Sequence, residues 1–239
     1  MADKEKYNQS IAKVFDILTL GQNGAKHVKN FEEYDSGGIN TLVDAKLLKK
    51  MPENARIVLS YEVYQTLNLL QKHTTKKDNE HKFLLSGKVS EGTIVFDDVY
   101  ANVGDNQHSA GFRGQSADVA SAFIERAENN NADNNVIICM RHTHRNKAKY
   151  QHNFSLKDMV AYYDTRETNA SFKSRKMELI SCVLIEGNYN FVFYDENAND
   201  FFKFTNVQYI TKYGQLKSLP AYTEKGQINF LKRYFERDD

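Results

Sequence analysis

The chain is poor in the residues that most often cross-link, kink or interrupt a protein fold. Its 239 residues include two cysteines, two prolines and no tryptophan. Two cysteines are too few for the disulfide framework of a small secreted domain, and Cys139 and Cys182 each lie within an apolar run. We therefore expect two buried thiols in a reducing, intracellular setting, and no proline-rich linker between domains.

The chain also lacks an excess of charge of either sign and any long apolar run. Its 32 basic and 31 acidic residues give a formal net charge of +1, so no overall field would attract nucleic acid or anionic lipid. No apolar stretch approaches the roughly 18 residues that a membrane span needs, and the first residues do not form a secretory signal. We expect a cytoplasmic protein with neither a nucleic-acid nor a membrane partner.

What the chain does contain is enough apolar side chain for a sizeable core. Hydrophobic residues make up 41% of the sequence and aromatic residues 12%. The length exceeds that of a typical single domain but falls short of two. The simplest division is an N-terminal helical extension over residues 1–54, a core domain over 55–204, and a C-terminal extension over 205–239 that ends in a helix.

Hydrophobic periodicity indicates an α/β protein. Apolar residues at helical spacing predict helices over residues 8–20, 40–51, 61–73, 116–128, 155–163 and 226–237. Short apolar or alternating runs predict strands over residues 56–60, 83–89, 93–99, 136–140, 179–185, 190–194 and 201–204. A polar run over 73–81 is typical of a loop, and residues 90–92 are typical of a hairpin connection.

Two histidines, His142 and His144, follow directly after the apolar strand predicted over 136–140. Residues i and i+2 of a strand point to the same face, so both imidazoles can be aimed at one point. Imidazole suits Zn²⁺, and a catalytic zinc site commonly uses three protein ligands and one open position. Asp158, which follows a loop over 145–154, is the candidate third ligand.

Each of these features also has a purely structural explanation. The segment from Ser155 to Asp158 fits a helix-capping pattern, and the charged run around Glu80 is typical of a solvated turn. The aromatic residues between 191 and 204 are expected to pack in the core. We expect the remaining histidines to lie at the surface: His27, His73, His81, His108 and His152.

Three segments resemble, in order and local context, the signature of the JAMM/MPN+ (JAB-type) zinc metalloprotease family. They are EHKFLLSG at 80–87, HTH at 142–144 and SLKD at 155–158. The family shows a glutamate seven residues before a glycine that closes a leucine-rich strand, then His-[Ser/Thr]-His, then Ser-x-x-Asp. The resemblance covers about residues 55–194. Arg145 stands where the family usually has proline. Ten residues separate His144 from Ser155, where the family usually has seven between the second histidine and the serine.

The resemblance implies an α/β fold of the MPN type (cytidine-deaminase-like), a curved mixed β-sheet flanked by helices, here with helical N- and C-terminal extensions. It implies a Zn²⁺ cofactor held by His142, His144 and Asp158. Glu80 would act as general base and then general acid, and Ser155 would donate a hydrogen bond to the developing oxyanion. The implied activity is hydrolysis of an isopeptide or peptide bond, with a ubiquitin-like protein or related peptide as substrate.

Two other functions stay open at the level of sequence. A chain of this fold can be a non-catalytic scaffold or binding module, which zinc content and Glu80-dependent cleavage would separate from an enzyme. The RadC-like branch carries the same metal motif but is less clearly proteolytic. Nucleic-acid binding would favour that branch, although the neutral charge balance gives it no support.

Overall fold

The computed structural model of the chain describes residues 2–18, 48–77, 80–102, 115–130, 136–144, 154–168, 177–185 and 187–222. The helix predicted over 226–237, most of the helix over 40–51 and most of the loop over 145–154 lie outside the described residues. The helices are α1 (Ala2–Leu18), α4 (Tyr61–Lys77), α5 (Gln115–Asn129) and α6 (Leu156–Thr168). The strands are β1 (Lys49–Lys50), β2 (Arg56–Leu59), β3 (Lys82–Ser90), β4 (Thr93–Asn102), β5 (Val136–Thr143), β6 (Glu178–Ile185), β7 (Asn188–Asp195), β8 (Asp200–Phe204), β9 (Val207–Ile210) and β10 (Leu216–Leu219).

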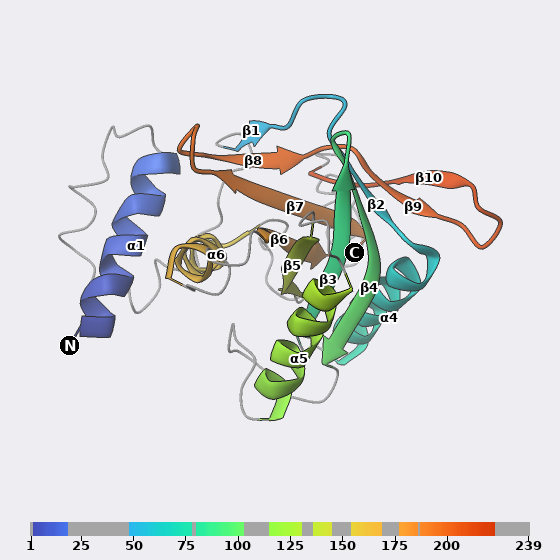
Figure 1. Ribbon diagram of the computed structural model, residues 1–239, viewed down its shortest axis with the longest axis horizontal. Helices are drawn as coiled ribbons and strands as arrows, with labels where there is room; N and C mark the ends of the chain where they lie inside the picture. Colours follow the sequence, from blue (N-terminus) through green and yellow to red (C-terminus); the bar gives the residue numbers. More distant parts are fainter. Residues whose placement is uncertain are drawn as a thin grey trace, which may run out of the picture.

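Ten strands of the described residues form one sheet, in the order β1-β8-β7-β6-β5-β3-β4-β2-β9-β10. The sheet is mixed, because β5 pairs in parallel with β6 but antiparallel with β3. Figure 1 shows β3 and β5 near the centre of the molecule and the β9–β10 hairpin projecting from one end. The predicted α/β class with a mixed sheet flanked by helices is confirmed.

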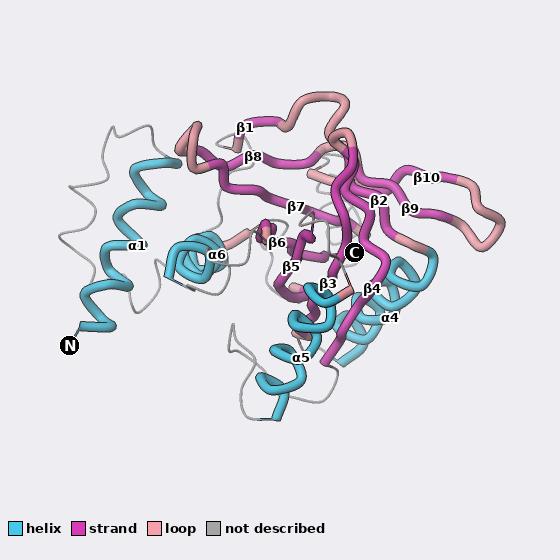
Figure 2. The backbone as a smooth tube through the Cα atoms, in the orientation of Figure 1, coloured by secondary structure: helices cyan, strands magenta, loops and turns pink. Residues whose placement is uncertain are grey.

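Strand alternation sends the side chains of β5 into two different cores. Ile138 packs in the core that includes α1 and α6, whereas Ile137 and Cys139 pack in the core beneath α4. Cys182 of β6 joins Cys139 in the latter core, and both are buried free thiols, as predicted. Figure 2 shows that α4 and α6 lie in different parts of the molecule around the central strands. Successive residues of β5 are therefore buried alternately in the two cores, one on each face of the sheet.

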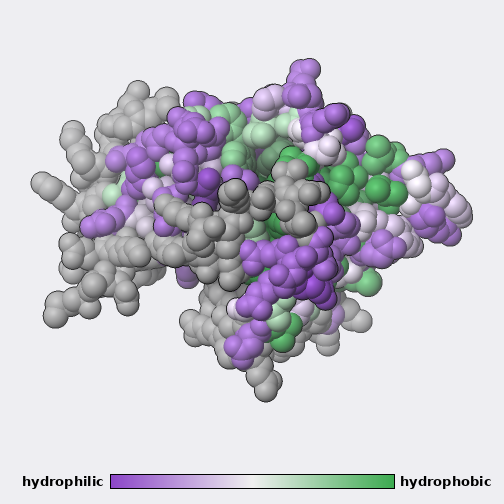
Figure 3. Space-filling view, in the orientation of Figure 1, coloured by the Kyte–Doolittle hydropathy of each residue, from purple (hydrophilic) through white to green (hydrophobic). Residues whose placement is uncertain are grey.

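Helix α5 covers the strands beside β5 with one apolar face. Ala120, Phe123 and Ala127 are buried at helical spacing, and Phe123 packs with Leu84 of β3. In the view of Figure 3, mostly hydrophilic atoms lie over α5, while hydrophobic atoms gather toward the root of the β9–β10 hairpin. The amphipathic pattern predicted for residues 116–128 is thus confirmed.

Helix α1 packs against the helix that carries Asp158. Ile11 and Val14 are buried in the same core as Met159 of α6, and the Ser10 hydroxyl donates a hydrogen bond to Asp164 Oδ1 over 3.1 Å. The start predicted at residue 8 is wrong, because α1 begins at Ala2. Ser10 lies within the helix and bonds to α6.

The hairpin between β3 and β4 depends on two glycines. Glu91 and Gly92 form its turn with φ values of 49° and 78°, a left-handed conformation that favours glycine. Gly87 lies at a β-bulge, where an added Cβ would stand 2.1 Å from the carbonyl oxygen of Val95. Gly87 is therefore required by the close approach of two backbones.

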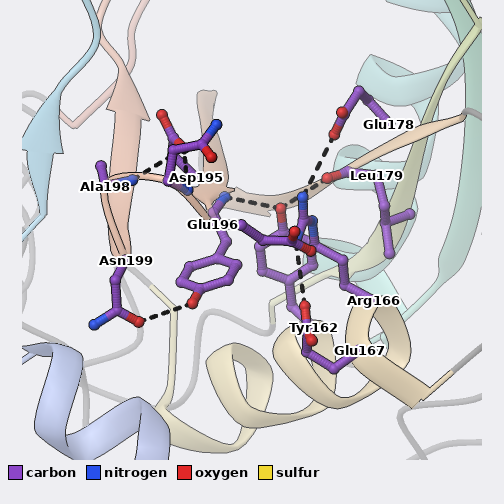
Figure 4. Close-up of polar contacts among 11 residues, drawn as sticks. Tyr162, Arg166, Glu167, Glu178, Leu179, Asp195, Glu196, Ala198 and Asn199 are labelled. Carbon is purple, nitrogen blue, oxygen red and sulfur yellow. Dashed lines mark hydrogen bonds and ion pairs between the residues drawn. The ribbon is translucent and has the colours of Figure 1, made fainter. Parts of the chain in front are cut away.

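Tyr162 fastens α6 to the sheet one turn after Asp158. The Tyr162 hydroxyl donates to the carbonyl oxygen of Leu179 over 2.7 Å and accepts from the amide of Tyr194 over 3.0 Å (Figure 4). The Tyr162 side chain is 1% exposed. Because α6 is tied to two strands at this residue, the first turn of the helix has a fixed position over the sheet.

The structure corrects three further sequence predictions. Lys49 and Lys50 form a strand that pairs with β8, rather than the end of a helix. The run predicted as a loop from residue 73 stays helical to Lys77. Strands β9 and β10 were not predicted, and β9 pairs in parallel with β2, so the sheet continues beyond residue 204. Among the described residues, no helix has the length and apolarity to cross a membrane.

Candidate metal centre

The two motif histidines lie where β5 ends in the middle of the sheet. His142 is the cross-strand partner of Lys82 in β3, and the amide of His144 donates to the carbonyl oxygen of Leu184 in β6 over 2.9 Å. Alternation places both imidazoles on the α6 side, the side to which Ile138 also points. The rings lie 4.8 Å apart between centroids. The sequence-based expectation that both point the same way is confirmed.

The third residue, Asp158, is delivered by the first turn of α6. The Ser155 hydroxyl accepts from the amide of Asp158 over 3.2 Å, and the amide of Ser155 donates to Asp158 Oδ2 over 2.8 Å. This reciprocal pair is a capping box. Phe154 and Met159, on either side of the cap, are both buried in the same core, as in a hydrophobic staple. The cap therefore fixes both the helix start and the Asp158 carboxylate.

The three side chains converge. His142 Nε2 lies 3.5 Å from Asp158 Oδ1, and His144 Nε2 lies 3.2 Å from Asp158 Oδ2. One ligand atom from each residue can be chosen so that all three lie within 4.8 Å of one another. The residues are buried, with exposed fractions of 8%, 4% and 4%. No second group of this kind occurs in the described part of the chain.

The electrostatics of Asp158 favour an anion. Burial raises the pKa of its carboxyl, but His142, His144 and the hydrogen bond from Ser155 outweigh burial and hold that pKa well below its usual range. The carboxylate is consequently ionised across the neutral pH range. Together with two imidazoles it offers a negatively charged set of oxygen and nitrogen donors.

The donor set fits a metal ion. Ligands about 2.0–2.1 Å from a tetrahedral zinc stand about 3.3 Å from one another. The two imidazole–carboxylate separations, 3.5 Å to Asp158 Oδ1 and 3.2 Å to Asp158 Oδ2, are close to that value but reach different oxygens of the carboxylate. Two imidazoles and one carboxylate suit zinc, but they also suit other divalent transition metals. The arrangement supports a metal site and does not by itself select the metal.

Glu80 and Ser155, the other predicted site residues, also lie at this cluster. Glu80 Oε2 is 4.0 Å from His142 Nε2, and its side chain is 22% exposed, so it borders the cluster. The Ser155 hydroxyl donates to Asp158 Oδ2 over 2.7 Å. All five predicted residues are therefore brought together from segments that are far apart in the sequence.

Comparisons with known proteins add no assignment. Neither a family model nor a curated protein matches this chain. The case for a function rests on the residues themselves and on the geometry that they adopt.

The sequence reasoning misplaced one histidine. His81 was expected at the surface, but it is 3% exposed, and its Nε2 lies 2.7 Å from Nδ1 of the half-buried His73. His27, His108 and His152 lie outside the described residues. Strand alternation could have predicted this burial. His81 lies two residues before the apolar Phe83, so both side chains point toward the core beneath α4.

Proposed function

We propose that the chain is a zinc-dependent hydrolase of the JAMM/MPN+ type, with an MPN-type fold. Its reaction would be cleavage of an isopeptide or peptide bond at the C-terminal tail of a ubiquitin-like protein or a related peptide. The observation that carries the proposal is the convergence of His142, His144 and Asp158, whose ligand atoms lie within 4.8 Å of one another. Glu80 stands beside them, with its Oε2 4.0 Å from His142 Nε2, and this proximity suits a group that acts on water at the metal.

The order of elements supports the fold part of the proposal. Glu80 precedes β3, the His-Thr-His segment ends β5, and the Ser-x-x-Asp segment begins α6. Gly87, the glycine that closes the first motif segment, has a physical requirement of its own at the β3–β4 bulge. The three motif segments thus each have a defined place in the fold of this chain.

The chemistry that zinc supplies in such a site is the activation of water as a nucleophile near neutral pH. The Glu80 carboxylate would accept a proton from the water as its oxygen adds to the scissile carbonyl carbon. The same carboxyl would then give the proton to the leaving amine as the C–N bond breaks. The partial exposure of Glu80 is compatible with access of a substrate to this side of the cluster.

Ser155 would perform two tasks in turn. In the structure its hydroxyl hydrogen is directed to Asp158 Oδ2, which orients the carboxylate toward the imidazoles. To stabilise an oxyanion, the hydroxyl must rotate toward the substrate, while the Ser155 amide keeps its hydrogen bond to the same carboxylate oxygen. The amide therefore preserves the orientation of Asp158 during the reaction.

The bond class and the substrate are supported by the family resemblance. The two nitrogen donors and the carboxylate would serve many metal-assisted hydrolyses equally well. The resemblance in three motif segments is what favours an amide bond to an amine leaving group. It also favours an extended peptide tail, which a protein can hold through backbone hydrogen bonds.

The proposal is tested by cleavage of a ubiquitin-like tail joined to a lysine side chain. Glu80→Gln should lower the rate by at least about 100-fold, the range typical of a lost general base, while the bound zinc is retained. Glu62→Gln, which alters an exposed carboxylate at the start of α4, is the matched control and should cleave normally. Equal cleavage by wild type and Glu80→Gln would contradict the assigned role. A folded, zinc-loaded wild type that cleaves nothing would favour the scaffold instead.

A further inference from the structure

The residue between the two histidines points away from the metal cluster. Strand alternation directs the side chain of Thr143 to the α4 side of β5, opposite to His142 and His144. Thr143 is 0% exposed. Its Oγ1 lies 2.5 Å from Oγ1 of Thr74 in α4, which is a hydrogen bond between two buried hydroxyls.

Thr143 also holds the backbone of the residue that follows Glu80. Its hydroxyl oxygen accepts from the amide of His81 over 2.9 Å, and its own amide donates to the carbonyl oxygen of His81 over 2.9 Å. Both backbone polar groups of His81 are therefore bound to one residue. Because Glu80 and His81 have opposite parity, this attachment on the α4 side leaves Glu80 directed to the metal side.

Helix α4 completes the attachment from the other direction. His73 of α4 contacts the His81 ring through its Nδ1, 2.7 Å from His81 Nε2. One turn of the helix thus supplies His73 to the ring of His81 and Thr74 to the hydroxyl of Thr143. The helix itself is fixed by fully or nearly fully buried apolar residues along its length: Val63, Leu67 and Leu70.

We infer that Thr143 is a positioning residue, which sets the place of the Glu80 carboxylate relative to His142 and His144 through its hydroxyl. The inference rests on the proposed function, since it assigns to Thr143 the alignment of the base in that reaction. Thr143 is joined by peptide bonds to both proposed metal ligands, His142 and His144. Its hydroxyl is hydrogen-bonded to the amide of the residue after Glu80, so this one residue links the proposed base to the proposed ligands.

A positioning role predicts a particular pattern of effects. A misplaced general base slows the chemical step, because proton transfer needs hydrogen-bond reach between base and water. It does not remove metal ligands. Loss of the Thr143 hydroxyl should therefore lower kcat and leave both KM and the zinc content as they are.

The test compares Thr143→Val, Thr143→Ser and Thr211→Val with wild type. Valine keeps the shape of threonine and removes only the hydroxyl, and serine restores it. Thr211 is the matched control, because its hydroxyl also accepts backbone amides, those of Tyr213 and Gln215, but in the β9–β10 turn. We expect Thr143→Val to lower kcat by about 10- to 100-fold, with recovery in Thr143→Ser and no change in Thr211→Val.

A second readout does not depend on activity. Amide hydrogen exchange at His81 should be about tenfold faster in Thr143→Val than in wild type, because the amide loses its acceptor, and Thr143→Ser should restore the slow rate. Unchanged exchange at His81, or an unchanged kcat in an active protein, would overturn the inference. We call the hydrogen-bonded group of His73, Thr74, His81 and Thr143 the Thr143 clamp. Wild-type protein that neither holds zinc nor cleaves would instead contradict the proposed function and the catalytic role of this clamp, whatever the exchange result.

Discussion

The two ends of α6 carry polar clusters of opposite character. At its start, the buried Asp158 carboxylate faces two imidazoles. These three side chains offer oxygen and nitrogen lone pairs but carry no permanent positive charge. At its end, Arg166 contacts three carboxylates and lies over the Tyr194 ring (Figure 4). The nearest of these carboxylates, that of Glu196, is 2.5 Å from Arg166 Nη1, and the side chains of Glu178 and Glu196 are each 54% exposed.

The difference shows why one cluster is a candidate site and the other is not. The Arg166 cluster contains its own cation, and its partly exposed carboxylates are solvated, so the group is complete without a ligand. The Asp158 cluster is almost fully buried and contains no permanent cation. A divalent ion would complete it, because the ion satisfies the carboxylate and the two imidazoles together.

The largest expected effect comes from removing the charge of Asp158. Asp158→Asn keeps an oxygen that can accept the Ser155 hydrogen bonds, but it removes the anionic ligand. Zinc affinity should fall by more than about 100-fold, which exceeds the loss usual for residues that only support a ligand. A competition titration with a chromophoric chelator measures this change. An affinity equal to that of wild type would show that Asp158 is not a ligand.

The N-terminal helix should contribute to stability without contacting the site. Val14→Ala removes two methyl groups at a position that is 0% exposed in the core shared with α6. We expect the free energy of unfolding in urea to fall by about 2 kcal/mol. Lys13→Ala, at an exposed position of the same helix, is the control. If Val14→Ala and Lys13→Ala have equal stability, α1 does not form part of this core.

The other end of α6 should respond more weakly. Arg166→Gln removes the cation that contacts Glu167, Glu178 and Glu196, two of which are largely exposed. We expect the free energy of unfolding to fall by about 1 kcal/mol, with zinc affinity unchanged. The same urea and chelator measurements apply. A large loss of zinc affinity would mean that the two ends of α6 are coupled, contrary to the contrast drawn between them.

A separate prediction distinguishes the two ends by pH in the zinc-free protein. The pKa of Asp158 is lower in the folded chain, so its ionisation stabilises the fold above about pH 4, and this contribution is lost as pH falls toward the folded-state pKa. Burial, with the neighbouring Tyr194 and Glu167, raises the pKa of Tyr163 to about 12, so its contribution is present below about pH 10 and is lost between pH 10 and 12.

Unfolding in urea across the pH range measures both contributions. Asp158→Asn should flatten the acid side of the stability profile and leave the alkaline side unchanged, whereas Tyr163→Phe should do the reverse. Identical profiles for the two variants would contradict the assignment of the two sides to the two ends of α6.

Sequence pattern was sufficient for most of the helices and strands and for the direction of the two site histidines. Alternation in β5 and capping preference at Ser155 are local properties, so the direction of both histidines and the start of α6 followed from neighbouring residues. Strand β9 was missed because its pairing with β2 is a distant contact, and β10 was missed because it pairs with β9 and its residues are mostly exposed. Tertiary pairing, rather than an apolar pattern, makes them strands.

The clamp around Thr143 escaped prediction for a related reason. Its residues come from α4, the segment before β3, and β5, and their polar side chains resemble surface residues when each is taken alone. Their burial depends on satisfying one another through the Thr74–Thr143 and His73–His81 hydrogen bonds. Such mutual satisfaction is visible only after the three segments have been placed together.

The most direct measurement is the zinc content of the purified wild-type chain after dialysis against a zinc buffer, beside His142→Ala, His144→Ala and the control His73→Ala. The account predicts about one zinc ion per wild-type chain, loss of that zinc in both ligand variants, and its retention in His73→Ala. A folded wild type without zinc, or zinc that persists when His142 or His144 is replaced, would contradict the claim that these residues and Asp158 form the metal centre.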